Sequence, residues 1–287
     1  MKPFTFYTPS SAEEALRLLT SEPSAQIIAG GQTLLLEMKV RQATPATLVS
    51  VSSIPELLGW GVAENGTLDV GACVTYFTLG GAPLAGWWRE LSTAFGSIAD
   101  RATRNRGTVG GSLCSGEARY DAPTLAVGAD ADVSTVSLDG VRDLTALDFL
   151  MNQEAAPEGV SILTRIRFPA VERWQGFAFE KVSPRQFDSA VVSVTVAVAI
   201  NVDRTVREAR VVVGALGRVP VLATGAANRL MGLSVDAEPS SAVGDIADEI
   251  VTLTESSSRY SRYQQALLPA LFRRTATRAF EQARSAK

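Results

Sequence analysis

Two glycine-bearing segments contain the residues whose types and spacing could do chemistry. The first, Ala29–Thr33, reads Ala-Gly-Gly-Gln-Thr. It lies between a short apolar run and a leucine-rich run that starts at Leu34. A strand that ends in glycines before a helix lets main-chain N–H groups approach a phosphate without interference from a Cβ atom. A glycine pair after a strand is also an ordinary turn, so this segment alone leaves both interpretations open.

The second segment, Arg104–Leu113, reads Arg-Asn-Arg-Gly-Thr-Val-Gly-Gly-Ser-Leu. Thr108 and Ser112 place hydroxyl groups on either side of its glycine pair, and such groups can donate hydrogen bonds to an anion. If the first segment binds one side of a diphosphate, this segment could surround the other side. It could also be a structural loop packed against a sheet. Two such loops together are more informative than either one alone.

The composition excludes several kinds of chemistry. The chain contains no histidine, which removes histidine general bases, histidine-bearing nucleophile arrangements, histidine-ligated metals and a histidyl-linked flavin. Its two cysteines, Cys73 and Cys114, are too few for an iron–sulfur cluster or a structural zinc. We expect no metal on this chain, and we interpret Cys114 as a small apolar residue unless its thiol has a depressed pKa.

Length and charge narrow the class of protein further. A chain of 287 residues exceeds the usual size of a single core, so two or more lobes are expected. The net charge of −3 gives no basic field for nucleic acid. The segment Met1–Ser10 lacks the features of a secretion signal, and no apolar run is long enough to span a bilayer. We therefore expect a cytoplasmic protein without a membrane span.

Hydrophobic periodicity predicts elements that would position the two loops. Residues 1–56 read as a small α/β lobe with a parallel sheet, and residues 57–172 as a second lobe that contains a hairpin and a helix ended by Arg106–Gly111. Residues 173–287 read as an α+β domain with three antiparallel strands and two helices. The predicted elements are helices at 11–20, from Leu34, at 87–98, at 242–254 and at 260–284 with a kink at Pro269, and strands at 25–29, 48–51, 60–72 as a hairpin, 177–181, 191–202 and 209–216.

In these two loops and their order, the sequence resembles the FAD-binding medium subunit of the molybdenum hydroxylases, which include xanthine dehydrogenase and carbon monoxide dehydrogenase. That family has an Ala-Gly-Gly-x-Ser/Thr loop near the N-terminus and then an Arg-Asn-x-Gly-Thr-Ile-Gly-Gly-Ser/Asn loop. The Pro3-Phe4 opening, the segment Leu163–Pro169 and the Tyr- and Arg-rich terminal helix are also similar to the family. The resemblance covers essentially the whole chain.

The resemblance implies an α+β fold, in which a two-lobed vanillyl-alcohol-oxidase-like (PCMH-type) FAD-binding domain precedes a small C-terminal domain with a three-stranded antiparallel sheet and helices. It implies that the two loops hold the diphosphate of non-covalent FAD, and that three further residues lie near the cofactor. The implied cofactor-binding residues are Ala29, Gly30, Gly31, Gln32, Thr33, Leu34, Thr108, Val109, Gly110, Gly111, Ser112, Asp121, Leu163 and Lys181. No catalytic residue is implied.

The three residues outside the loops have ordinary alternatives. Asp121 could cap a helix, Leu163 could be core, and Lys181 could be a solvated strand end. The sequence also departs from the family after the second loop, because Cys114–Asp121 reads Cys-Ser-Gly-Glu-Ala-Arg-Tyr-Asp where relatives usually have Ala-His-Ala-Asp-Pro-Ala-Ala-Asp. In relatives this stretch passes beside the flavin and the iron–sulfur partner, so the departure concerns the route by which electrons enter.

For function, the resemblance implies an oxidoreductase subunit that accepts electrons from [2Fe-2S] clusters of a partner and passes them to an external acceptor such as dioxygen, NAD or a quinone-linked carrier. The partners would be a small iron–sulfur subunit and a large molybdopterin subunit, in a heterotrimer or its dimer. Two alternatives remain at this point. One is a free-standing FAD-dependent oxidase or dehydrogenase that acts directly on a small molecule, and the other is a binding or scaffold protein that has lost flavin.

Overall fold

The computed structural model describes residues 2–154, 160–239, 249 and 261–286, and the chain divides into two compact units. Each unit is assembled from three stretches of sequence. The first comprises Met1–Leu79, Asp100–Gly116 and Ala131–Phe168, and the second comprises Gly80–Ala99, Glu117–Asp130 and Pro169–Lys287. No helix among the described residues combines the length and the apolar character that a membrane crossing requires.

The first unit opens with a three-stranded parallel sheet in the order β1-β3-β2, which confirms the predicted parallel sheet, although the sequence predicted neither β1 nor the strand order. Its strands are β1 (Thr5–Tyr7), β2 (Ala25–Ile28) and β3 (Thr47–Ser50), and its helices are α1 (Ala12–Ser21) and α2 (Leu34–Lys39). Ser11 caps α1 by accepting a hydrogen bond from the Glu14 N–H at 3.2 Å. Helix α1 packs with Val49, whereas α2 packs with its neighbour Leu48, so the two helices cover opposite faces of the sheet.

A five-stranded antiparallel sheet completes the first unit, in the order β4-β5-β8-β6-β7. Its strands are β4 (Trp60–Val62), β5 (Leu68–Gly71), β6 (Asp132–Ser137), β7 (Gly140–Thr145) and β8 (Ser161–Phe168). The remaining helices of this region are η1 (Pro55–Leu57), α3 (Tyr76–Gly80), α5 (Arg101–Arg104), α6 (Val109–Cys114) and α8 (Ala146–Glu154). Pairing of β4 with β5 confirms the predicted hairpin, while the pairing of β5 with the distant β8 was not predicted.

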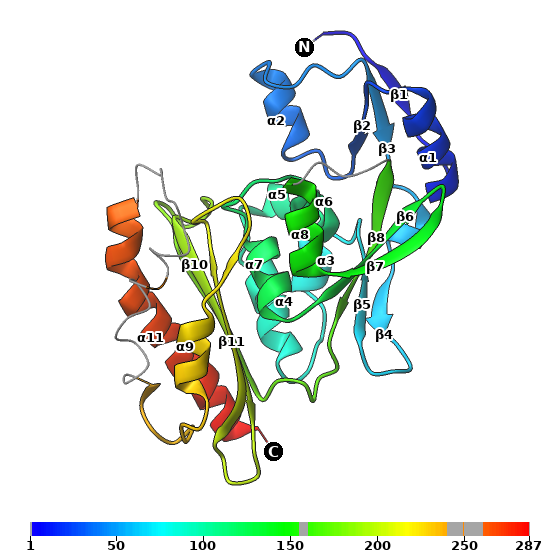
Figure 1. The fold of residues 1–287 in the computed structure, drawn as a ribbon. Coiled ribbons are helices and arrows are strands. Elements are labelled where there is room, and N and C mark those ends of the chain that lie inside the picture. Colours follow the sequence, from blue (N-terminus) through cyan, green and yellow to red (C-terminus); the bar gives the residue numbers. More distant parts are fainter. Residues whose placement is uncertain (1, 155–159, 240–248, 250–260, 287) are drawn as a thin grey trace. The chain divides into compact units, whose positions relative to one another are not determined.

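The second unit is built on a four-stranded antiparallel sheet in the order β12-β11-β10-β9. Figure 1 labels its two long central strands, β10 and β11. Its strands are β9 (Gly176–Val182), β10 (Val192–Ile200), β11 (Val206–Gly214) and β12 (Val221–Leu222), and its helices are α4 (Trp88–Gly96), α7 (Asp121–Gly128), α9 (Thr224–Leu230) and α11 (Ser261–Ser285). The three predicted strands are confirmed. The prediction missed β12, which has only two residues and therefore too short a pattern to recognise.

The two faces of this sheet differ in chemistry, and each holds different helices. Along β10, the alternate residues Val192, Val194 and Val196 belong to the core that α9 and α11 share. The residues between them, Ser193 and Thr195, are buried on the opposite face and bond to Thr124 of α7. Strand alternation thus produces one valine-rich face and one small, polar face.

The structure corrects the predicted end of one helix, confirms the terminal helix and does not describe most of a third predicted helix. The segment Arg106–Gly111 does not end the helix α4, because α4 ends at Gly96 and α5 follows it. Gly96 packs closely against Gly80, where an added Cβ would lie 2.6 Å from the Gly96 Cα atom. Helix α11 confirms the predicted terminal helix, and it continues through Pro269. The helix predicted at 242–254 lies outside the described residues, apart from residue 249.

The contact between β9 and α11 generates a stability prediction. A Cβ atom at Gly176 would lie 2.0 Å from the carbonyl oxygen of Ala279, so Gly176→Ala must push α11 away from the sheet. We expect it to lower the free energy of unfolding by about 1–3 kcal/mol in chemical denaturation followed by circular dichroism. The matched control is Gly61→Ala in β4, where a Cβ meets no atom within 4 Å and the change should stay within about 0.5 kcal/mol. Equal losses in both variants would contradict this packing argument.

Candidate functional site

The first glycine turn presents unused main-chain donors. It leaves β2 at Ile28 and enters α2 at Leu34, and Gly31 has a φ of 72°, a conformation that favours glycine. The carbonyl of Gly31 accepts a hydrogen bond from Leu35, but within the described residues the N–H groups of Gly30, Gly31 and Gln32 donate none. Successive N–H groups around a left-handed residue form a concave anion site. This turn therefore fits a phosphate.

The second glycine turn uses its main-chain donors internally. Thr108 caps α6, and its hydroxyl oxygen accepts a hydrogen bond from the Gly111 N–H at 3.0 Å. The Val109 N–H donates to Val74 at 3.0 Å and the Gly110 N–H donates to Ala72 at 2.9 Å. The fold itself therefore uses these three N–H groups. The role of residues 108–112 toward a diphosphate stays a prediction.

The two turns, although distant in sequence, are in contact. A Cβ atom at Gly30 would lie 2.0 Å from the carbonyl oxygen of Arg106, and one at Gly111 would lie 3.9 Å from the Cβ atom of Ala29. Gly30 is therefore required by the approach of the two main chains to each other. Gly110 also has a packing reason, since its Cβ would lie 2.6 Å from that of Ala72. The structure thus brings the two predicted loops together.

The sequence analysis missed the segment that supports the second turn, Ala72–Tyr76. Besides Ala72 and Val74, it supplies Tyr76, whose N–H donates to the Gly107 carbonyl at 3.0 Å and whose hydroxyl contacts the Ser112 hydroxyl. The Tyr76 ring also limits position 107, because a Cβ there would lie 2.9 Å from the ring. No motif marks this segment, which begins where the predicted hairpin ends, at Ala72.

Asp121 and Lys181 meet within the second unit. Asp121 is the first residue of α7, Lys181 lies near the end of β9, and the Asp121 carboxylate and the Lys181 ammonium form an ion pair. Their side chains are 3% and 13% exposed, so Lys181 is not a solvated strand end. Asp121 is not the cap of α7 either, because Tyr120 occupies the N-cap position. Burial raises the pKa of Asp121, and the attraction of Lys181 opposes that rise. The Oδ1 atom of Asp121 has no hydrogen-bond partner among the described residues.

The other residues singled out in the sequence have ordinary surroundings. Leu163 is buried in β8 of the first unit, as its core alternative predicts, and its position relative to a cofactor stays a prediction. Burial raises the pKa of Cys73 to about 12. The pKa of Cys114 is also raised to about 12, by desolvation of the thiol and by Cys73, although the residue as a whole is exposed. Neither thiol has the depressed pKa of a redox nucleophile.

Comparisons with known proteins match nearly the whole length of the chain. Residues 2–171 match the model of the FAD binding domain in molybdopterin dehydrogenase, and residues 177–279 match the CO dehydrogenase flavoprotein C-terminal domain. The carbon monoxide dehydrogenase medium chain of Hydrogenophaga pseudoflava is 29% identical over 281 residues, which cover 96% of this chain and 97% of the relative. The nicotine 6-hydroxylase medium subunit of Paenarthrobacter nicotinovorans is 28% identical, with 96% of each chain covered.

Solved structures extend the similarity to the fold. Quinoline 2-oxidoreductase from Pseudomonas putida 86 contains a chain that superposes with a TM-score of 0.88 at 29% sequence identity, covering 99% of both chains. The predicted fold class, an FAD-binding domain followed by a C-terminal domain with an antiparallel sheet, is confirmed by this similarity. Since the FAD-domain model matches more than half of the residues, this chain belongs to the family of FAD-binding subunits of the molybdopterin dehydrogenases.

Proposed function

We propose that this chain is the FAD-binding, electron-transferring medium subunit of a molybdenum hydroxylase complex. The observation that carries the proposal is the first glycine turn, whose N–H groups at Gly30, Gly31 and Gln32 have no protein acceptor among the described residues. A fold in which main-chain donors stay unused at a strand-to-helix turn is suited to an anionic ligand. FAD supplies such an anion in its diphosphate, and the family to which the chain belongs binds FAD.

The residues proposed to hold FAD have different tasks. The turn Ala29–Thr33, with Leu34, would bind the diphosphate through main-chain N–H groups, and residues 108–112 would support that turn and offer the hydroxyl groups of Thr108 and Ser112. Asp121, Leu163 and Lys181 would lie near the flavin. Bound FAD supplies the redox chemistry that carries electrons from the iron–sulfur clusters of a partner to an external acceptor. FAD cannot be attached to this chain through a histidyl bond, because the chain contains no histidine.

The phosphate turn alone cannot supply the required affinity. Anion binding at a helix terminus contributes about 0.3–1 kcal/mol at an exposed site, and a charge-assisted hydrogen bond about 1.5–3 kcal/mol. Submicromolar affinity requires more than about 8 kcal/mol. The adenine and isoalloxazine rings must therefore also be bound, and this chain's role is to bind and orient the cofactor.

The partners follow from the relatives. Those relatives are named as medium chains or subunits, which favours a subunit over a free-standing oxidase. The partners proposed here are a small iron–sulfur subunit and a large molybdopterin subunit, in a heterotrimer or its dimer. We also propose that the assembly is cytoplasmic. The division of this chain into domains at 1–56, 57–172 and 173–287 is likewise a proposal.

A glycine substitution tests the phosphate turn. Gly31→Ala places a side chain at a φ of 72°, and this costs about 1 kcal/mol or drives the turn to a different backbone conformation that separates the N–H groups. Because charge-assisted hydrogen bonds are lost, we expect the dissociation constant of FAD to rise by about tenfold or more. The measurement is flavin released on denaturation, together with a fluorescence titration of the FAD-depleted protein.

The matched control is Gly232→Ala. Gly232 has a φ of 78° and open space around its Cβ position, so the backbone cost is similar while the phosphate turn is untouched. We expect this variant to retain FAD. Full FAD retention in Gly31→Ala, or equal loss in both variants, would refute the assignment of the turn.

Affinity purification of the tagged full chain from its native host tests the subunit assignment. We expect two further polypeptides, one smaller and one larger, and expect molybdenum and iron in the purified complex by metal analysis. A monomer that binds FAD and oxidises a small molecule without partners would instead establish the free-standing alternative. A colourless protein that takes up no FAD would refute both.

A further inference from the structure

Arg106, which precedes the second glycine turn, lies directly beside the first one. A Cβ atom at Gly30 would lie 2.0 Å from the carbonyl oxygen of Arg106 and 2.8 Å from its carbonyl carbon. Both segments belong to the first unit. The side chain of Arg106 therefore starts next to the turn in which the N–H groups of residues 30–32 have no acceptor among the described residues.

Hydrogen bonds on both sides hold the main chain at Arg106. Its N–H donates to the Thr103 carbonyl at 3.1 Å, in helix α5. That helix is capped by Asp100, whose carboxylate accepts a hydrogen bond from the Thr103 N–H at 2.7 Å. On the other side, the carbonyl of Gly107 accepts from the Tyr76 N–H at 3.0 Å. The base of the Arg106 side chain is thus fixed by the fold.

The guanidinium of Arg106 is available for a ligand. The residue is exposed, and in the part of the chain that the structure describes its side chain forms no hydrogen bond or ion pair. A cation at this place adds its field to the partial positive charges of the neighbouring N–H groups. The first turn and Arg106 therefore form one positively charged surface within the first unit.

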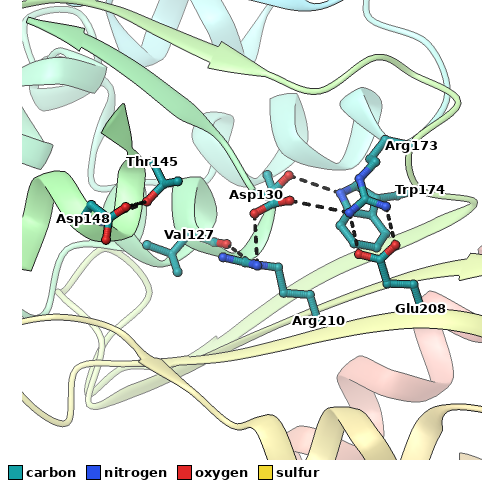
Figure 2. A network of polar contacts seen from close by, with 9 residues as sticks. Val127, Asp130, Thr145, Asp148, Arg173, Trp174, Glu208 and Arg210 are labelled. Atoms are coloured by element: carbon teal, nitrogen blue, oxygen red, sulfur yellow. Dashed lines mark hydrogen bonds and ion pairs between the residues drawn. The ribbon is translucent and has the colours of Figure 1, made fainter. Parts of the chain in front are cut away.

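Arginines of the second unit have different surroundings (Figure 2). Arg173 forms a two-point ion pair with Glu208, at 2.5 Å for each contact. The Nε of Arg210 donates to the Val127 carbonyl at 2.6 Å, and its Nη1 lies 3.0 Å from Asp130. These guanidinium groups bind within the protein and stabilise its fold. Arg106 has no such task in the described structure.

A diphosphate needs more positive charge than the first turn supplies. Each of its phosphates is negatively charged, whereas the turn offers only the partial charges of main-chain N–H groups. The N–H groups of Val109, Gly110 and Gly111 are bonded within the fold and cannot serve a ligand without breaking those bonds. Hydrogen bonds from a charged donor are roughly twice as strong as neutral ones, and a guanidinium matches two phosphate oxygens at once.

We propose that Arg106 is a cofactor-binding residue whose guanidinium binds the diphosphate of FAD at the first glycine turn. The inference rests on the proposed function, because it takes that turn to hold the diphosphate. It adds a residue to the site, since the resemblance to the family implies contacts from residues 108–112 and none from Arg106. The main chain of Arg106 thus supports the turn at Gly30, and its side chain supplies the charge.

Arg106→Gln tests this assignment by removing the charge at an exposed position. Glutamine keeps a flexible, polar side chain and leaves the main-chain contact with Gly30 intact, and Arg106→Lys keeps the charge. Arg142→Gln is the matched control: Arg142 lies in the edge strand β7 of the same unit, is exposed, and has no side-chain hydrogen bond or ion pair with the described residues. Each variant is made in the full chain within its complex.

The readout is the dissociation constant of FAD, measured by fluorescence titration of the FAD-depleted complex. It is measured at about 0.1 M and at about 1 M salt, where the Debye length is about 10 Å and about 3 Å. At the lower salt concentration, we expect Arg106→Gln to raise the dissociation constant about tenfold or more, because charge-assisted hydrogen bonds are lost. Arg106→Lys should stay within about threefold of the wild type, and Arg142→Gln within about twofold.

Salt dependence separates a charge contact from a structural effect. At the higher salt concentration, the ratio between Arg106→Gln and the wild type should fall to about threefold or less, because screening weakens the contact of an exposed charge. A ratio that does not change with salt, or a loss that lysine does not restore, overturns the inference, since Arg106 would then act through the fold.

Two further results would overturn the inference. One is an unchanged dissociation constant in Arg106→Gln, which would leave the assignment of the first turn intact if Gly31→Ala loses FAD. The other is an equal loss in Arg106→Gln and Arg142→Gln, because only the net charge of the chain would then matter. Failure of the wild-type complex to bind FAD refutes the proposed function instead. If Arg106→Gln lacks a cooperative thermal transition, Arg106→Met takes its place, with the same expected and overturning results.

Discussion

The close approach of two main chains, at Gly30 and Arg106, is the constraint on which the first unit depends. Only a residue without a Cβ allows this contact, since that atom would lie 2.0 Å from the Arg106 carbonyl oxygen. The contact holds the second turn against the first. The segment Ala72–Tyr76 fixes the second turn. It accepts hydrogen bonds from the N–H groups of Val109 and Gly110, and it packs against Gly107 and Gly110. The N–H groups of Gly30, Gly31 and Gln32 can therefore stay without a main-chain acceptor in the described part of the chain while the turn keeps its shape.

This arrangement separates two tasks that a glycine motif can perform. In the first turn, which contains the left-handed Gly31, the N–H groups of residues 30–32 have no acceptor among the residues that the structure describes, and this is costly in a folded chain unless water or a ligand accepts them. In the second turn, the same residue types serve helix capping and close packing. A phosphate bound at the first turn would meet a preorganised site, because the fold orients the donors before any anion arrives.

In the second unit, charged residues are buried or half-buried against a sheet. Strand alternation gives the sheet a valine-rich face for α9 and α11 and leaves a polar face for α7. On that face every described charge that contacts α7 has an opposite charge beside it, with Lys181 at one end of the helix and the arginines at the other. Removing one partner of such a pair exposes the other to a large desolvation cost.

Two family models together match nearly the whole chain, and both describe parts of FAD-binding subunits of dehydrogenases. In a flavoprotein subunit of this family, the work of the protein is to bind and tune the redox cofactor. The residues Cys114–Tyr120, for which the resemblance implies a departure from the family pattern, follow the second turn. Helix α7, which carries Asp121, begins immediately after them.

The sequence by itself determined the local elements and the candidate turns. Alternation and helical periodicity predicted the parallel strands β2 and β3, the β4–β5 hairpin and the terminal helix, because these patterns are set by neighbouring residues. Glycine pairs with hydroxyl neighbours predicted both turns. The tertiary structure alone decided which N–H groups are used, that Tyr76 supports the second turn, and that Arg210 reaches α7. Those outcomes depend on contacts between segments far apart in sequence, and hydrogen-bond satisfaction is a property of such contacts, not of residue type.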